Sequence, residues 1–91
     1  MVSVRGEIDC ATAPRLGATL EGLATAGQIV LVDLGGTEFM DCAGLGVLIA
    51  SHQRLRHLGG DLVIESPNGS VARVLELTGV LEVMTVTNSA D

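Results

Sequence analysis

The hydrophobic and polar positions of this chain follow two periods, one typical of strands and one typical of helices. Val2, Val4 and Ile8 fall on one side of a period-two pattern, which predicts a short strand ending at residues 6–9. Residues 29–34 are an unbroken apolar run rich in β-branched side chains, which predicts a strand buried on both faces. Residues 35–37 (Gly-Gly-Thr) predict a turn after it. Two further strands are predicted at residues 61–65 and 83–86.

Between these strands, apolar residues recur at the spacing of amphipathic helices. We expect helices at about residues 10–26, 43–58 and 69–78. Pro14 falls in the first turn of the first helix, where a missing N–H costs little. The core face of the second helix is predicted to carry Leu45, Leu48, Ile49, His52 and Leu55. Alternation of strand and helix predicts one α/β domain over residues 1–91, with a mixed, mainly parallel four-stranded sheet and three helices.

The amino-acid composition excludes several classes of molecule as binding partners of this chain. Eleven acidic residues against five basic ones give a net charge of −6, which argues against nucleic acid, because phosphate backbones are bound by clustered lysine and arginine. No apolar stretch approaches the ~18–20 residues of a membrane span, and the first residues carry no apolar signal region. We therefore expect a cytoplasmic protein without membrane insertion. The cysteines lack metal-ligand spacing, so we expect no metal and no cofactor.

The residues that could catalyse a reaction are poorly arranged for it. A nucleophilic Cys42 would need a base within hydrogen-bond reach, but His52 lies ten residues further along the same predicted helix, about 15 Å away. Asp9, Asp33 and Asp41 could gather at the carboxyl ends of the strands, where open α/β sheets bind ligands. Aspartate at strand ends and helix starts is also ordinary capping. We expect no enzyme.

The start of the second helix is unusual because residues 41–46 place two glycines in its first turn. Each glycine costs about 0.5–1 kcal/mol relative to alanine in a helix. Close packing against the sheet and docking of a partner both explain such a cost, and the sequence leaves both open. The outer face of this helix is also small and apolar, which favours a protein interface. That face carries Ala43, Val47, Ala50 and Leu58, interrupted by Ser51 and Arg54.

Five short motifs resemble the STAS domain of bacterial anti-sigma factor antagonists, over about residues 4–86. They are Gly6-Glu7-Ile8-Asp9, Val32-Asp33-Leu34, Phe39-Met40-Asp41, Gly44-Leu45-Gly46-Val47-Leu48 and Val74-Leu75-Glu76-Leu77-Thr78-Gly79. The resemblance implies a STAS-like fold, in which the usual first strand and last helix of the family have no counterpart here. Two alternatives within the family are a scaffold of a stress-signalling complex and a subunit of a lipid-transport ABC ATPase.

The resemblance implies that the partner is an anti-sigma factor, often a serine kinase, whose capture releases a sigma factor and turns on transcription. In the family, that kinase phosphorylates a serine directly after the aspartate of the motif, and the added charge breaks the complex. Cys42 occupies this position, so the usual switch is missing unless Thr12, Thr37 or Ser51 replaces it. The expected contact residues are Asp9, Cys10, Asp41, Cys42, Ala43, Gly44, Val47 and Arg54.

Two further expectations concern regulation and assembly. Cys10 and Cys42 both follow strand ends in the expected topology, which suggests a redox switch on the docking face, although two small buried side chains explain them as well. A sheet that lacks the family's first strand exposes an edge, and an exposed edge invites pairing with another chain. A homodimer through that edge is therefore one arrangement that the sequence allows, and the sequence does not decide the oligomeric state.

Overall fold

The computed structural model describes residues 2–67 and 69–87. The sequence also predicts a polar tail at residues 87–91, which lies outside this part from residue 88 onward. The strands are β1 (Val2–Ile8), β2 (Ile29–Met40), β3 (Asp61–Glu65) and β4 (Thr85–Thr87). The helices are α1 (Ala13–Gly22), α2 (Cys42–His57) and α3 (Gly69–Leu77), followed by a 3-10 turn, η1 (Val80–Glu82).

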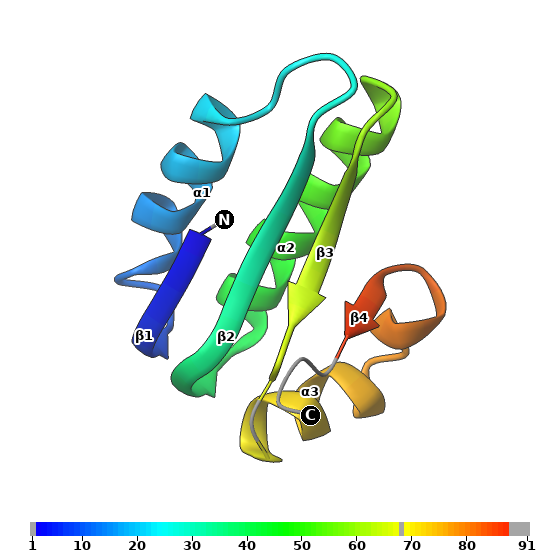
Figure 1. Cartoon of the computed structure of the whole chain (residues 1–91). Helices are drawn as coiled ribbons and strands as arrows, with labels where there is room; N and C mark the ends of the chain where they lie inside the picture. The colour runs from blue at the N-terminus through cyan, green and yellow to red at the C-terminus, as the bar shows by residue number, and fades with distance from the viewer. Residues whose placement is uncertain (1, 68, 88–91) are drawn as a thin grey trace.

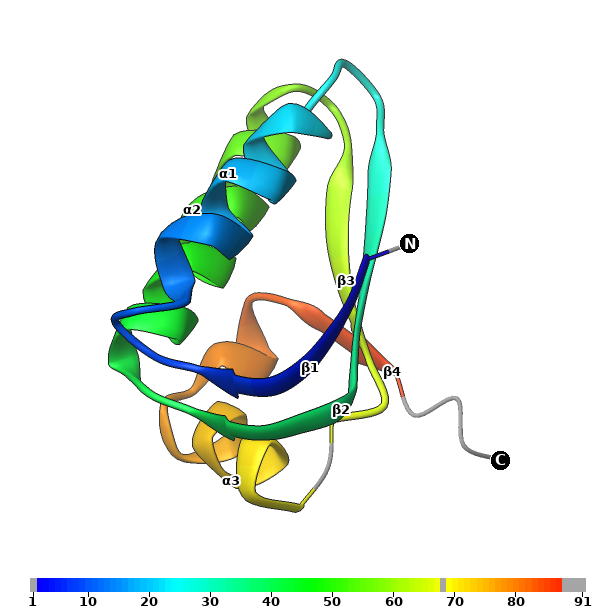
Figure 2. The same cartoon turned by 90° about the vertical axis from the view of Figure 1, so that its left-hand side faces the viewer.

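The strands form a four-stranded sheet in the order β1-β2-β3-β4, and all three neighbouring pairs are parallel. Helices α1 and α2 lie side by side on one face of this sheet, and α3 lies near the carboxyl ends of its strands (Figures 1 and 2). The predicted α/β class, with a mainly parallel four-stranded sheet and three helices, is confirmed.

The core lies between the sheet and these helices. On β2 the side chains of Val30, Val32 and Leu34 are buried, whereas Ile29 is 60% exposed. Leu31 is only half-buried on the face that looks away from the helices. The prediction of a strand buried on both faces is therefore wrong, because α1 and α2 cover one face of β2 and leave the other open (Figure 2).

The predicted turn at residues 35–37 is also wrong, because β2 continues through it to Met40. The glycines mark a bulge instead: Ser3 of β1 pairs with Asp33 while Arg5 pairs with Gly36, so β2 holds one extra residue there. The Asp33 carboxylate accepts the Gly35 N–H at 2.8 Å and stabilises the bulge. A side chain at Gly36 would come within 3.0 Å of Arg5 Cγ.

The helix boundaries differ most from the prediction at the first helix. It covers residues 13–22 rather than 10–26, because residues 9–12 form a separate turn and the helix already ends at its C-cap, Leu23. Thr12 is the N-cap. Pro14 lies in the first turn, which is where the sequence predicts this proline. The last strand begins at Thr85 rather than at residue 83, since η1 occupies the preceding residues.

Candidate partner-binding site

The carboxyl ends of β1 and β2 lie next to each other and bring two loops together. Ile8 pairs with Met40, and the Asp41 N–H donates to the Ile8 carbonyl oxygen at 3.0 Å. The turn at residues 9–12 and the start of α2 at residues 41–46 therefore lie at the same end of the sheet, as the ribbon shows (Figure 2). We call these two segments together the carboxyl-end surface.

The turn at residues 9–12 is organised by Asp9. One oxygen of its carboxylate accepts the N–H groups of Ala11 at 2.9 Å and of Thr12 at 3.1 Å. The Thr12 hydroxyl accepts the Asp9 N–H at 2.9 Å and donates to the Glu7 carbonyl at 2.9 Å. The backbone N–H groups of Thr12 and Ala11 hold the pKa of the Asp9 carboxyl below its ordinary value, because they stabilise the ionised form. Asp9 thus shapes the turn.

Asp41 has the same role at the start of α2. Its carboxylate accepts the N–H groups of Ala43 at 2.9 Å and of Gly44 at 3.1 Å, and its backbone is extended, as expected of an N-cap. Asp33 likewise binds the N–H of Gly35 within the bulge. The geometry therefore supports a capping role for these three aspartates.

The two glycines of the first turn of α2 have different surroundings. Gly44 is buried, and a Cβ there would lie 2.9 Å from the Ile8 carbonyl oxygen and closer still to the Ile8 side chain. Gly46 is exposed, and a Cβ there would have nothing within 4 Å. Close packing on β1 therefore explains Gly44, whereas no contact within the described part of the chain explains Gly46.

Around these caps, the side chains that face solvent are small. Cys10, Cys42 and Ala43 are all exposed, and both thiols are free. A surface with small side chains at a helix N-terminus allows close approach of another backbone to the helix, while the N–H groups of Ala43 and Gly44 are already bonded to Asp41.

The outer face of α2 is partly covered by α1, which the sequence pattern did not reveal. Val47 is half-buried, because its Cγ1 lies 3.6 Å from the position that a Cβ on Gly17 of α1 would take. Leu58 is also half-buried, whereas Ala50 and Arg54 are exposed. Part of the apolar composition of this face therefore serves the packing of α2 against α1.

A shallow groove of about 500 Å³ remains between α1 and α2. One wall of the groove is formed by α1 residues that the sequence pattern did not mark as a candidate site. The sequence feature that predicts this wall is the run of small residues along α1. The lining includes Gly17, Ala18, Ala24, Val47, Ala50 and Arg54.

The two histidines differ in exposure, and His52 has a carboxylate as its partner. His52 is 12% exposed and its Nε2 lies 3.3 Å from Asp61 Oδ1 at the start of β3. His57 is exposed. Within residues 2–67 and 69–87, no three His, Cys, Asp or Glu side chains are grouped as metal ligands, and no helix has the length and apolar character of a membrane span.

The alternative hydroxyl acceptors have very different accessibility. Thr37 is fully buried and donates to the Val4 carbonyl at 2.8 Å, so a kinase cannot reach it in the folded chain. Thr12 is exposed but holds the turn at residues 9–12 together, and Ser51 is half-buried beside the groove.

These observations define an α/β domain that carries its candidate site at the carboxyl end of a parallel sheet, beside the N-terminus of a helix packed tightly on the first strand. The model of the STAS domain family matches residues 1–91. The chain belongs to the STAS family, and the resemblance drawn from its motifs is confirmed.

Similar proteins in this family are named as anti-sigma factor antagonists. The Anti-sigma-B factor antagonist of Listeria monocytogenes is 34% identical over 88 residues, covering 96% of this chain and 77% of that protein. The Anti-sigma-F factor antagonist RsfA of Mycobacterium tuberculosis is 34% identical over 89 residues, covering 94% and 70%. The crystal structure of an anti-sigma factor antagonist from Mycobacterium paratuberculosis is 29% identical, with a TM-score of 0.82 over 93% of this chain and 73% of that chain.

Proposed function

We propose that this chain is an anti-sigma factor antagonist, a regulatory protein without enzymatic activity that binds an anti-sigma factor and thereby frees a sigma factor for transcription. Membership of the STAS family and the names of its relatives support this function. The observation that carries the choice of site is the start of α2, where Asp41 and Gly44 fix the helix on β1 and leave Cys42, Ala43 and Gly46 exposed.

The residues of this surface divide into two roles in the proposal. Asp9, Asp41, Gly44 and Val47 hold the loops and the helix in place, because each is engaged with its own chain. The exposed residues meet the partner directly. These are Cys10, Cys42, Ala43 and Arg54.

Binding to the cognate anti-sigma factor tests this site directly. Ala43→Glu adds a negative charge to the exposed first turn of α2, where the helix dipole favours it, so the fold should be retained. We expect it to weaken binding by about ten-fold or more. Gln53→Glu adds the same charge to an exposed residue further along α2 and should leave the affinity unchanged. Equal affinities for both variants and the parent chain would refute the site, and absence of binding by the parent chain would refute the function.

We further propose that the partner is of the serine-kinase type and that Cys42 removes the usual phosphorylation switch. The thiol is exposed at the helix start, but it replaces the hydroxyl that the family's kinase modifies. With ATP and the cognate kinase, residue 42 should stay unmodified, whereas Cys42→Ser should gain one phosphate and lose affinity. Cys10→Ser is the matched control, because it introduces a hydroxyl on the same surface outside the motif. Phosphate on the parent chain that weakens binding would contradict the proposal.

Regulation by oxidation is a separate proposal for the same surface. Cys10 and Cys42 are exposed, and each lies two residues beyond the paired residues Ile8 and Met40. Oxidised glutathione would oxidise the two thiols to a Cys10–Cys42 disulfide. Its own disulfide would be reduced, and two molecules of reduced glutathione would leave with the two thiol protons. A loss of two thiols together with a change in affinity supports the switch. An unchanged affinity, or the same response in Cys10→Ser, rules it out.

A further inference from the structure

The groove between α1 and α2 begins beside the carboxyl-end surface and follows both helices. Each helix returns from the carboxyl end of one parallel strand to the amino end of the next, so α1 and α2 point in the same direction (Figure 2). Val47 lies against Gly17, and Glu21 follows one turn further along α1. From Pro14 to Ala24 the groove is about 15 Å long, which suits about three turns of a helix.

The chemistry of the groove changes along its length. Over most of it the walls are small and apolar. The residues of this part are Pro14, Gly17, Ala18, Val47 and Ala50. At the end away from the carboxyl-end surface, one exposed charge stands on each wall, Glu21 on α1 and Arg54 on α2. Within residues 2–67 and 69–87 neither of these two charges has an ion-pair partner, so both are available to an occupant of the groove.

Packing of α1 against α2 explains only part of this composition. Gly17 and Val47 are half-buried where the two helices meet. Ala18 and Ala50 are exposed instead, one on each wall of the groove, so burial in the core of this chain does not set their size. Small side chains on two facing walls let a third helix approach closely, because the side chains at a contact set the distance between helix axes.

We propose that the groove receives a helix of the anti-sigma factor, which presents a carboxylate to Arg54 and a basic side chain to Glu21. This proposal rests on the proposed function and extends its site from the carboxyl-end surface along α2, since Val47 and Arg54 belong to both. The two charges fix the orientation of the helix, because any other orientation leaves them unpaired or beside a like charge.

A second copy of this chain is the other occupant that the charges allow. A two-fold axis would also bring Arg54 of each copy opposite Glu21 of the other. Two facing grooves are both hollow, however, and would leave space between them, whereas well-packed interfaces are as dense as protein interiors. A helix fills the groove, and the groove is continuous with the partner-binding site. Both observations favour the anti-sigma factor.

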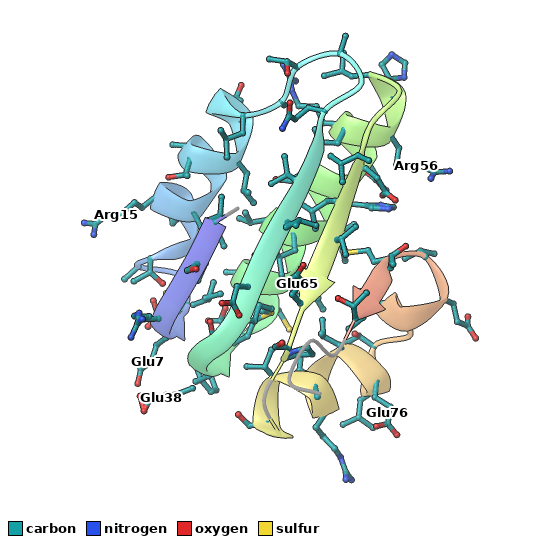
Figure 3. All side chains as sticks on the ribbon, in the orientation of Figure 1. Glu7, Arg15, Glu38, Arg56, Glu65 and Glu76 are labelled. Atoms are coloured by element: carbon teal, nitrogen blue, oxygen red, sulfur yellow. The ribbon has the colours of Figure 1, made fainter. Side chains whose placement is uncertain are left out.

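Charge reversals on the two walls test the proposal through the affinity for the anti-sigma factor. Arg54→Glu and Glu21→Arg should each weaken binding by about ten-fold. Arg56→Glu is the matched control for the first, because Arg56 is exposed in the same helix turn but lies about 200° around α2 and points away from α1 (Figure 3). Glu76→Arg, at an exposed residue of α3, is the control for the second. Both controls should bind like the parent chain.

The double variant Arg54→Glu with Glu21→Arg separates local recognition from net charge. It keeps the net charge of the parent chain and exchanges the signs of the two walls. We expect it to bind at least as weakly as either single variant, because both contacts are then reversed. Recovery of the parent affinity would overturn the proposal, as would an affinity indifferent to either single reversal. Circular dichroism checks that each variant is folded.

The small walls are tested without a change of charge. Ala18→Gln places a longer side chain in the groove and should weaken binding by about ten-fold. Thr19→Gln alters the next residue, which is exposed and lies outside the groove, and should leave the affinity unchanged. Equal affinities for these two variants would contradict a helix seated in the groove.

Two further outcomes distinguish this proposal from its alternatives. Sedimentation velocity of the chain alone reports the second copy: a dimer that Arg54→Glu dissociates and the double variant restores would overturn the proposal. Weaker binding by Ala43→Glu, with no effect of the groove variants, would overturn the groove and leave the proposed function standing. Absence of binding by the parent chain would refute both.

Discussion

Alanine at Gly44 and at Gly46 should change stability in opposite directions, although the two substitutions are two residues apart in one helix turn. At Gly44 the new methyl group would lie 2.9 Å from the Ile8 carbonyl oxygen and would overlap the Ile8 side chain. At Gly46 the methyl group would enter open space. Each variant is therefore the matched control for the other.

The magnitudes follow from two opposing effects. Alanine in place of glycine stabilises a helix interior by about 0.5–1 kcal/mol, and this gain applies to both variants. At Gly44, overpacking against β1 costs about 1–3 kcal/mol, and moving α2 outward also lengthens the hydrogen bond from the Asp41 N–H to Ile8. We expect Gly46→Ala to stabilise the chain by about 0.5–1 kcal/mol and Gly44→Ala to destabilise it by up to about 3 kcal/mol.

Urea unfolding followed by far-ultraviolet circular dichroism measures both effects. The chain contains no Trp and no Tyr, so intrinsic fluorescence is a poor probe. For 91 residues the total free energy of unfolding is about 5–14 kcal/mol, so the Gly44 effect is a visible fraction of it. The midpoint should fall for Gly44→Ala and rise for Gly46→Ala at an unchanged slope. A midpoint for Gly44→Ala at or above that of the parent chain would refute the packing argument.

Three further predictions concern the residues that hold the site and the bulge. Asp41→Ala removes the N-cap of α2 and should destabilise the chain by about 1 kcal/mol in urea unfolding, whereas Asp41→Asn should retain most of that stability. The pKa of the Asp9 carboxyl is lowered from 3.8 in the folded chain. The ionised carboxylate therefore stabilises the fold above pH 3.8, and this stabilisation is lost as the pH falls through the pKa of the folded state. Asp9→Asn should weaken this dependence of the thermal midpoint on acid pH. Thr37→Val leaves the Val4 carbonyl without its 2.8 Å donor and should lower stability by about 1–3 kcal/mol, measured by the same urea titration.

The periodic parts of the fold could be predicted from sequence because burial repeats along them. Leu45, Leu48 and Leu55 were expected on the core face of the second helix, and all three are buried. His52 was expected among them as a packed residue and is only 12% exposed. These residues follow the helical period closely, and the rest of the chain has little influence on which face they take.

The second strand could not be predicted as well, because its local sequence fits two arrangements. An apolar run such as residues 29–34 suits a strand covered on both faces, but only the arrangement of α1 and α2 decides how many faces are covered. Ile29 is left exposed for this reason. A pair of glycines is equally typical of a turn and of a bulge, and the pairing of Arg5 with Gly36 distinguishes them only in three dimensions.

The candidate site shows the same division between what is local and what depends on contacts across the fold. Aspartate before a helix start is a local signal, and Asp41 is indeed the cap of α2. The reason for Gly44 depends on Ile8, which lies 36 residues earlier in the chain and meets it only because β1 and β2 are parallel neighbours. Once the capping bonds of Asp9 and Asp41 are accounted for, both carboxylates are engaged with their own backbone. In the proposed site, the exposed side chains of the carboxyl-end surface are then small and uncharged, namely Cys10, Cys42 and Ala43, and Arg54 on α2 adds a positive charge. We therefore expect recognition to combine the close approach of another backbone at the helix start with a charged contact at Arg54.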